Sequence, residues 1–211
     1  MIIIAIDGPA AAGKGTLAKR LAATLKLPYL DTGLLYRATA KRVLEAGADP
    51  SDELAALAAA LELSDDDTAR EDLRDAATSK AASQVSAIPA VRQTLLAYQR
   101  AYGSAKGAVL DGRDIGTVIF PHADVKLFVT ASAETRARRR HAEFSARGET
   151  ISLADVLADV IARDEADRTR ASAPLIPAHD AVLIDTTSMN ADEAYAHALQ
   201  IIKAKTSKKS F

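Results

Sequence analysis

Residues 2–16 read IIIAIDGPAAAGKGT, an apolar run followed directly by a glycine-rich turn. The run 2–6 predicts a buried strand, and residues 17–25 behind the turn predict a helix. Gly8 and Gly13 enclose four residues and Lys14 follows at once, which is the spacing of a phosphate-binding loop between a strand and a helix. Backbone N–H groups of such a loop and the positive end of the new helix attract phosphate oxygens. The stretch therefore predicts an α/β fold that binds a nucleotide.

Lys14 can reach the terminal phosphates of that nucleotide as a point charge. Gly15 separates Lys14 from the hydroxyl residue Thr16, a departure from the general pattern, and we still expect Thr16 near the phosphates or a Mg²⁺ ion. A plain strand-to-helix turn is the alternative, but it does not require two glycines and a lysine at this spacing. We expect the nucleotide to contact the whole loop, which consists of Gly8, Pro9, Ala10, Ala11, Ala12, Gly13, Lys14, Gly15 and Thr16.

The composition of the 211 residues is that of an ordinary globular protein, with 48% hydrophobic and 26% charged residues. A net charge of −1 gives no overall field that would recruit nucleic acid or a membrane. Cysteine is absent, which excludes disulfides and thiolate metal sites and is compatible with a reducing cytoplasm. The N-terminal apolar run lacks a basic region and is too short for a signal peptide or a membrane span. We expect a cytoplasmic protein, a monomer, that contacts neither nucleic acid nor membranes.

Short apolar runs recur along the chain, each followed by a turn and a helix-like stretch. This alternation predicts a parallel sheet of five strands with helices on both faces. After the first run, the others are 27–30, 108–110, 125–130 and 181–184.

Two long segments leave the predicted sheet, and we call them the first excursion (residues 33–102) and the second excursion (residues 132–177). The first is almost entirely helical in pattern, and Pro89 suits the first turn of a helix that runs to about Tyr102. The second is rich in arginine and aspartate and fits two helices with a break at Gly148. Long excursions from a sheet commonly carry binding lobes or lids. A last helix is expected over 192–203, with a frayed tail over 205–211.

The residues that follow the second predicted strand, DTGLLYR at 31–37, are expected at the ligand side of the sheet. Ligands of open α/β sheets bind at the carboxyl ends of the strands, so Thr32, Tyr36 and Arg37 should lie beside the phosphate loop. We expect Tyr36 and Arg37 to begin the helix that lines a second pocket. The alternative, with Tyr36 in the core and Arg37 in solvent, is equally compatible with this segment alone.

DGRDIG at 111–116 ends the third predicted strand on the same side. Asp111 is placed to hold Mg²⁺ through water, as phosphoryl-transfer sites often require. Arg113 and Asp114 would project opposite charges into one crevice. A local ion pair within the turn is the other reading, which two flanking glycines and a preceding inner strand make less favourable.

Charged residues of the second excursion have helical spacing. Arg163, Asp167 and Arg170 stand at i, i+4 and i+7 and so share one helix face. This face is either a solvated salt-bridge ladder or a surface that closes over a polyanion. Phosphoryl transfer favours the second reading, because it needs cations around the transferred group. Further arginines start the same excursion: Arg136, Arg138, Arg139 and Arg140.

Five stretches together resemble the bacterial cytidylate kinases, of the nucleoside monophosphate kinase group. They are IDGPAAAGKGT, LDTGLLYR, ASQVSAIPAVR, LDGRDIGTVIFP and RDEADRTRASAPL, and they span Asp7 to Leu175. The resemblance implies a P-loop kinase with a core of residues 1–32, 103–131 and 178–211. The first excursion would be its monophosphate-binding lobe and the second its lid. The chain departs from the typical family pattern in having a short, acidic segment at 63–77, so we expect a small lobe without extra strands.

The implied reaction is the ATP-dependent phosphorylation of CMP, and of dCMP, to the diphosphate. ATP would bring Mg²⁺, with Thr16 and Asp111 near the ion, and Lys14, Arg113 and Arg170 would act in catalysis. Carried over residue by residue, the CMP site consists of Thr32, Tyr36 and Arg37 on the monophosphate, Ser83, Arg92 and Asp114 on the cytosine, Arg113 at phosphate, Arg163 and Asp167 on the sugar, and Arg170 on the reacting phosphates. A carboxylate suits the cytosine amino group, and Arg92 suits N3 and O2.

Two other functions are compatible with the phosphate loop. One is a related small-molecule kinase that acts on UMP, AMP or a non-nucleotide acceptor, which would not need the set Ser83, Arg92 and Asp114. The other is a nucleotide-binding switch without catalysis. A switch would lack a second pocket that binds an anion. We expect Arg37, Arg92 and Arg113 all to lie near such a pocket.

Overall fold

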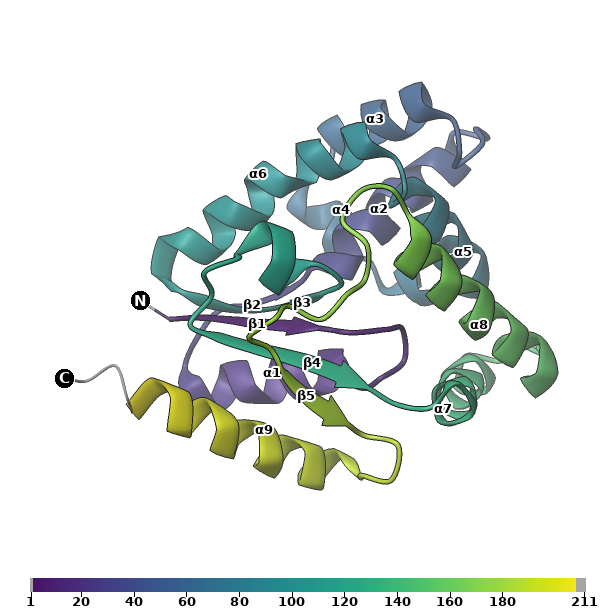
Figure 1. Cartoon of the computed structure of the whole chain (residues 1–211). Coiled ribbons are helices and arrows are strands. Elements are labelled where there is room, and N and C mark those ends of the chain that lie inside the picture. The colour runs from purple at the N-terminus through teal and green to yellow at the C-terminus, as the bar shows by residue number, and fades with distance from the viewer. Residues whose placement is uncertain (1, 208–211) are drawn as a thin grey trace.

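Five strands form a single parallel sheet in the computed structural model, which describes residues 2–207 (Figure 1). The strand order is β2-β3-β1-β4-β5, so the first strand of the chain lies at the centre. All neighbours pair in parallel, as the alternation of apolar runs and helices predicts. The strands are β1 (Ile3–Asp7), β2 (Tyr29–Asp31), β3 (Ala108–Gly112), β4 (Val125–Thr130) and β5 (Val182–Asp185).

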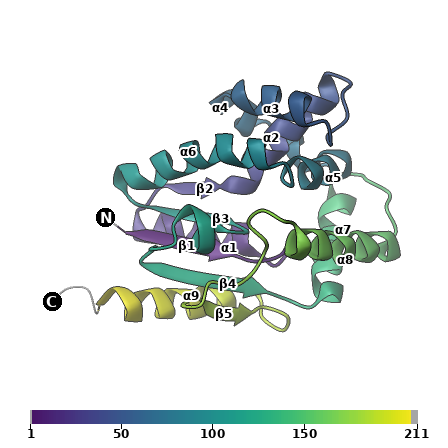
Figure 2. The ribbon, with the colours of Figure 1, turned by 45° about the horizontal axis from the view of Figure 1, so that its top comes forward.

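Helices cover both faces of the sheet because the side chains of β1 alternate between two apolar layers. Ile4 and Ile6 pack with α1 (Lys14–Leu25) and α9 (Ala191–Thr206). Ile3 and Ala5 face the other way, toward α6 (Pro89–Lys106) and the short π-helical turn η2 (Ile115–Ile119). Figure 2 shows α6 and α9 on opposite sides of the strands. The central strand β1 is therefore buried on both faces. This packing fixes the position of its carboxyl end, where the phosphate loop begins.

The first excursion folds into helices alone, and all of its residues are described. Alanine-rich faces pack closely in their own apolar cluster, which includes Leu35, Val43, Val85 and Val91. No strand forms, as the short segment at 63–77 predicts. The elements are α2 (Thr32–Glu45), α3 (Glu53–Leu61), α4 (Asp65–Ala69), η1 (Glu71–Arg74), α5 (Ala76–Val85) and the first turns of α6.

The second excursion consists of α7 (Ala133–Ala146) and α8 (Leu153–Thr169), joined through Gly148 at φ +80°. The expected break at this glycine is confirmed. Serine side chains at positions 132 and 152 cap the two helices. Phe144, Val156 and Val160 pack the helices against each other. Figure 1 shows the pair at the carboxyl ends of the strands, where the phosphate loop also lies.

Three predicted helix boundaries differ from the structure. The helix α2 begins at Thr32, so Tyr36 and Arg37 lie one turn inside it and do not begin it. The helix α6 continues four residues past Tyr102 to Lys106, and its C-cap is Gly107, whose φ of +77° suits glycine. The helix α9 includes Lys205, whose ammonium donates to the carbonyl of Asp180, so the expected fraying does not begin there. Residues 208–211 of the expected tail lie outside the described residues.

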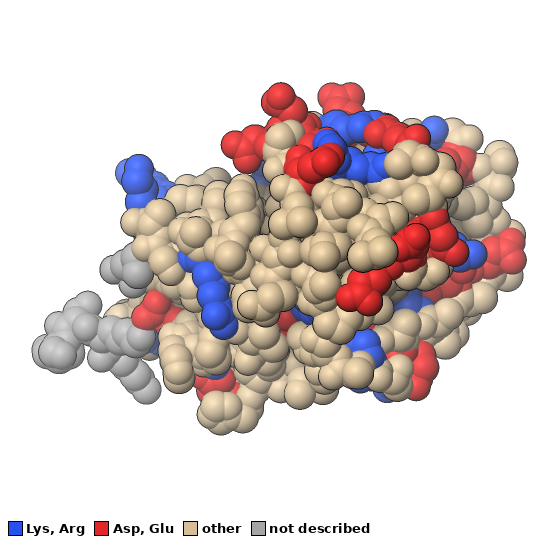
Figure 3. Space-filling view, turned by 90° about the horizontal axis from the view of Figure 1, so that it is seen from above, with Lys and Arg blue, Asp and Glu red and all other residues tan. Residues whose placement is uncertain are grey.

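The described residues contain no helix with the length and apolar character needed to cross a membrane. Acidic and basic side chains are interspersed on the face seen in Figure 3, and the described residues form no continuous basic surface there.

Candidate active site

The phosphate loop lies between β1 and α1, as its sequence predicts. Gly8 has φ +146°, and a Cβ at this position would overlap the carbonyl oxygen of Val129 on β4. Gly13 has φ +88°, and Ala11, at φ +58°, takes a left-handed conformation that alanine adopts at a cost. The side chain of Asp7 accepts hydrogen bonds from the backbone N–H groups of Ile115 and Gly116, both at 2.7 Å. The loop is therefore held from β4 on one side and η2 on the other.

Lys14 is 6% exposed and points back into the loop, where its ammonium donates to the carbonyl oxygen of Pro9 at 2.7 Å. Burial, together with the nearby Arg113, lowers the pKa of Lys14 below its ordinary value. A buried ammonium with one neutral acceptor is a strong binding site for a phosphate oxygen.

A cavity of about 500 Å³ opens in front of the loop. Seven lysine and arginine side chains line it against three acidic ones, so its lining attracts anions. It takes in Ala10, Ala11, Gly13, Lys14, Gly15 and Thr16 of the loop, but Gly8, Pro9 and Ala12 are not among its lining residues. The cations are Lys14, Lys19, Arg37, Arg74, Arg113, Arg140 and Arg163.

Asp111 and Thr16, the two residues expected near Mg²⁺, line this same cavity. The Tyr29 hydroxyl donates to Asp111 at 3.0 Å, and burial beside the Asp31 carboxylate raises the pKa of Asp111. The described residues contain no cluster of three acidic, histidine or cysteine side chains that could hold a metal unaided. Magnesium in phosphoryl-transfer sites usually needs only one or two carboxylates, because phosphates and water complete its shell. The residues present fit an ion that arrives with a nucleotide.

A second, narrower cavity of about 50 Å³ lies deeper, between α2, α6 and α8. Arg92 and Asp114 form a buried ion pair across it at 2.5 Å, with side chains 8% and 7% exposed. The guanidinium of Arg92 also lies over the ring of Tyr36, 5.4 Å from the centroid. Of the residues expected to bind CMP, those that line this cavity are Thr32, Tyr36, Arg92, Arg113, Asp114, Arg163, Asp167 and Arg170.

The helix α8 brings the charged face of the second excursion to this cavity. Arg113 of the core donates to Asp167 at 2.8 Å, and Arg170 lies 3.9 Å from Asp114. Asp167 is 4% exposed, and the surrounding arginines hold its pKa below the ordinary value despite burial. The solvated-ladder reading of this face is therefore wrong. So is the local Arg113–Asp114 pair, because each residue pairs with a partner far along the chain.

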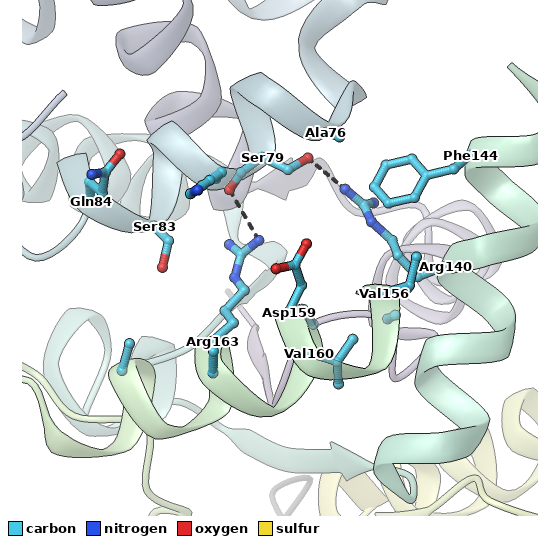
Figure 4. Close-up of a pocket in the computed structure, with 15 residues that line it drawn as sticks. Ala76, Ser79, Ser83, Gln84, Arg140, Phe144, Val156, Asp159, Val160 and Arg163 are labelled. Atoms are coloured by element: carbon cyan, nitrogen blue, oxygen red, sulfur yellow. Dashed lines mark hydrogen bonds between the residues drawn. The ribbon is translucent and has the colours of Figure 1, made fainter. Parts of the chain in front are cut away.

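Two of the expected CMP-binding residues lie outside the narrow cavity. Arg37 lines the larger, cationic one. Ser83 lies on a third cavity, of about 260 Å³, between α5 and the second excursion (Figure 4). Its neighbour Ala82 faces the narrow cavity, and one residue along a helix turns the side chain by about 100°. Ser83 is therefore not among the residues that line the narrow cavity with Arg92 and Asp114, and its role on the cytosine stays a prediction.

The arginines at the start of the second excursion have different roles. Arg136, 4% exposed, donates to both oxygens of Asp164 on α8, at 3.0 and 2.5 Å, and to the carbonyl of Ala10 at 3.3 Å. Arg139 donates to the hydroxyl and carbonyl oxygens of Thr186. Arg140 faces the larger cavity, whereas Arg138 is exposed.

Sequence reasoning missed Ser79 and Arg74, which the fold brings to the cationic cavity region. Arg74 donates to Asp31 at 2.6 Å, next to Asp111. Ser79 accepts hydrogen bonds from arginines of three different helices. A serine in an alanine-rich helix carries no local signal, and these partners are far away along the chain.

Comparison with known proteins is consistent with this geometry. A family model described as cytidylate kinase matches residues 4–204. A cytidylate kinase of Acidiphilium cryptum strain JF-5 is 58% identical over 201 residues, covering 95% of this chain and 95% of that protein. A cytidylate kinase of Paramagnetospirillum magneticum strain AMB-1 is 56% identical over 207 residues, covering 96% of this chain and 98% of that protein. Both match over nearly their whole lengths, so neither carries a long insert that this chain lacks.

Solved structures support the fold. A gluconokinase from Sinorhizobium meliloti 1021 has a TM-score of 0.53 at 15% identity, covering 100% of this chain and 98% of that one. An uncharacterised protein from Eubacterium ventriosum ATCC 27560 has a TM-score of 0.55 at 14% identity, covering 97% of this chain and 99% of that one. At these identities the likeness is one of architecture.

Proposed function

The chain belongs to the cytidylate kinase family, and we propose that its two adjoining cavities bring ATP and CMP together for phosphoryl transfer. The enzyme is a kinase that phosphorylates CMP to CDP, and we propose dCMP as a second acceptor. The observation that carries the assignment of the two sites is that Arg113 and Arg163 line both the cationic cavity and the narrow one. A phosphate bound in either cavity would meet the same two guanidinium groups.

The donor phosphates are assigned to the loop and Lys14. The amide groups and the start of α1 would hold the β- and γ-phosphates, with the Lys14 ammonium exchanging its bond to Pro9 for a phosphate oxygen. Asp111 and Thr16 would hold Mg²⁺ with the nucleotide, and the ion would supply neutralisation of charge on the β- and γ-phosphates.

The acceptor nucleotide is assigned to the narrow cavity. Asp114 would accept from the cytosine amino group, and Arg92 would donate to N3 or O2. The base would therefore bind to both side chains of the Arg92–Asp114 ion pair. Arg37 and Arg113 would hold the monophosphate, and Asp167 would face the sugar. A cavity of about 50 Å³ is too small for a nucleotide, so CMP binding must widen it. The two excursions, as lobe and lid, would supply that movement.

The reaction needs positioning and charge neutralisation more than acid–base chemistry. An oxygen of the CMP phosphate attacks the γ-phosphorus, a P–O bond to CMP forms, and the P–O bond to ADP breaks. The nucleophile is already anionic, so no general base is required. Lys14, Arg113 and Arg170 would stabilise the charge on the transferred group.

A coupled assay across CMP, dCMP, UMP and AMP, with ATP or GTP as the donor, tests this function. We expect CMP to be the best acceptor. Lys14→Met should lower kcat on the order of a hundredfold or more, because one preorganised cation is lost from the transition state. A Lys14→Met protein with normal turnover, or a wild type that prefers UMP or AMP, would contradict the assignment.

A further inference from the structure

Ser79 of α5 lies where the two excursions meet, at the edge of the 260 Å³ cavity (Figure 4). Its hydroxyl oxygen accepts a hydrogen bond from Arg37 of α2 at 2.6 Å and another from Arg140 of α7 at 2.5 Å. Its backbone carbonyl accepts from Arg163 of α8 at 3.4 Å. One serine therefore joins an arginine of the first excursion to two arginines of the second.

The hydroxyl of Ser79 uses its full hydrogen-bonding capacity. A serine hydroxyl has one proton to donate and two lone pairs to accept with. The proton goes to the carbonyl of Asp75 at 2.6 Å, and the two guanidinium groups take the lone pairs. This fixes the orientation of the oxygen, because Asp75, the N-cap of α5, lies one helical turn before Ser79.

The cations around Ser79 are only partly neutralised, because Arg140 pairs with Glu143 at 3.1 Å whereas Arg37 has no carboxylate among its hydrogen-bond partners in the described residues. The hydrogen bonds of Arg37 go to neutral oxygens. Burial is the largest cause that lowers the pKa of Arg37, Arg140 and Arg163, the last to about 10, and neighbouring arginines lower each pKa further. Arginines that repel one another are held together here by a neutral acceptor, beside a cavity where seven basic side chains outnumber three acidic ones.

We propose that Ser79 is a positioning residue for phosphoryl transfer, whose hydroxyl holds Arg37 and Arg140 at one point so that both reach the phosphates together. All three arginines line the cationic cavity in front of the phosphate loop. The proposal rests on the proposed function for the identity of the anion. Ser79 does not touch the substrate in this scheme and acts through the two guanidinium groups.

Ser79→Ala tests the proposal by removing the common acceptor without adding bulk. We expect kcat with CMP to fall about tenfold or more, because a hydrogen bond to a charged group is lost and the two arginines separate. The KM for CMP should change less. Ser79→Thr keeps a hydroxyl and should restore most of kcat. Ser145→Ala is the matched control, since Ser145 is an exposed serine on α7 and should leave both constants unchanged.

Ser79→Asp makes a second, opposite test. Its carboxylate would pair with Arg37 and Arg140 and occupy the place of a phosphate. We expect a higher melting temperature than the wild type together with a KM for CMP raised tenfold or more. Titration calorimetry with inorganic pyrophosphate reports the same cluster without turnover. The wild type and Ser145→Ala should bind it at least tenfold more tightly than Ser79→Asp, in which the intact phosphate loop supplies the remaining affinity.

The outcomes separate this proposal from the assignment of the reaction. If Ser79→Ala keeps the wild-type kcat, or if Ser79→Asp binds pyrophosphate as well as the wild type does, the positioning role is wrong. If Ser79→Ala loses melting temperature, kcat and CMP affinity in parallel and Ser79→Thr recovers none of them, the role is structural only. A wild type that binds pyrophosphate but does not phosphorylate CMP would contradict the proposed function and leave the arginine cluster as an anion site.

Discussion

Asp114 is buried between two arginines, and each of its carboxylate oxygens has one ionic contact. It lies 2.5 Å from Arg92 and 3.9 Å from Arg170. Cytosine presents an amino group to a carboxylate, whereas uracil presents a carbonyl that the carboxylate repels. Base choice should therefore depend on the charge at this position and not on the shape of the cavity alone.

Asp114→Asn should lower kcat/KM for CMP far more than for UMP. The neutral amide weakens the attraction for cytosine, removes the repulsion against uracil and can donate to the uracil carbonyl, so the CMP-to-UMP ratio should fall by at least tenfold. The measurement is kcat/KM for both nucleotides in the wild type and the variant. Weaker Arg92 pairing will destabilise the variant, which affects both substrates alike and cancels in the ratio. An unchanged ratio would show that Asp114 does not read the base.

Asp7 makes the stability of the protein depend on pH. Burial raises its pKa from 3.8 to about 6, against the opposing effect of the Ile115 and Gly116 amides; nearby Asp114 raises it further and Lys14 lowers it. Between pH 4 and 6 the native state thus binds more protons than the unfolded chain. This group therefore lowers the free energy of unfolding as pH rises through that range, by about 3 kcal/mol in total.

Asp7→Asn lacks this titration. The free energy of unfolding of the variant minus that of the wild type, measured in urea, should increase by up to about 3 kcal/mol from pH 4 to pH 7. The absolute stability of the variant also reflects the lost acceptor for one η2 amide, so the pH dependence of the difference is what counts. A difference between the two proteins that stays constant with pH would mean that Asp7 titrates at its ordinary value.

Single functional residues were predictable from the sequence where a charged side chain directly follows the end of a predicted strand or its turn. Lys14 follows a glycine turn, and Asp114 follows the end of an inner strand, so a strand pattern alone places both on the ligand side. Ser79 and Ser83 show the limit. Which way a serine on a helix faces depends on how that helix is rotated against its neighbours, and no local pattern in an alanine-rich segment such as α5 reports this rotation.

At the scale of elements, α7 and α8 are tied to the phosphate loop through one ion pair. Arg136 donates to Asp164 on α8, to the carbonyl of Ala131 at the end of β4, and to that of Ala10 in the loop. A displacement of α8 would thus pull on a guanidinium that also holds the loop. The loop next to it contains Ala11 in a left-handed conformation, which depends on such support.

Asp164→Asn should loosen this connection. The Asp164 side chain is 25% exposed and that of Arg136 5%, so we expect a loss on the order of 2 kcal/mol in the free energy of unfolding. Amide hydrogen exchange should speed up in the phosphate loop as well as in α8. Asp159→Asn is the control, because Asp159 is an exposed carboxylate on the same helix. Faster exchange confined to α8 would show that the pair does not support the loop.

The elements themselves were largely predictable. The apolar runs predict all five strands. Gly148 predicts the break between the two helices of the second excursion, and Pro89 predicts the start of α6. The π-helical turn η2 could not be foreseen, because the carboxylate that accepts its first amides belongs to Asp7, more than a hundred residues earlier. Strand order is likewise a long-range property, and alternation alone predicts parallel pairing without stating which strand is central.

For the whole molecule, the contacts between the two excursions are polar and rich in arginine. Arg147 donates to the carbonyl of Arg74, and Arg140 and Arg163 donate to Ser79. Like charges gathered around a cavity repel one another when no anion is bound, and ATP with CMP would supply several negative charges. The second excursion should therefore close more firmly with substrates than without them.

Limited proteolysis with trypsin measures this closure. Cleavage between Arg138 and Arg170 should slow clearly when ATP and CMP are both present, and less with either alone. Cleavage at exposed basic residues elsewhere, such as Lys106 at the end of α6, should be unaffected and serves as the internal control. Equal cleavage of the second excursion under all conditions would mean that it is a static charged surface.

The central place of β1 has a consequence for the synthesis of this protein on the ribosome. Its partners are β3 and β4, and Ile3 pairs with Ala108. About a hundred residues must therefore be translated before the first neighbour emerges, which takes roughly 5–20 s at a synthesis rate of about 5–20 residues per second. During that interval a strand that ends up buried on both faces has only α1 to pack against. The nascent chain therefore carries an exposed apolar segment for about half of its translation, and we expect chaperones that bind apolar stretches at the exit tunnel to recognise it.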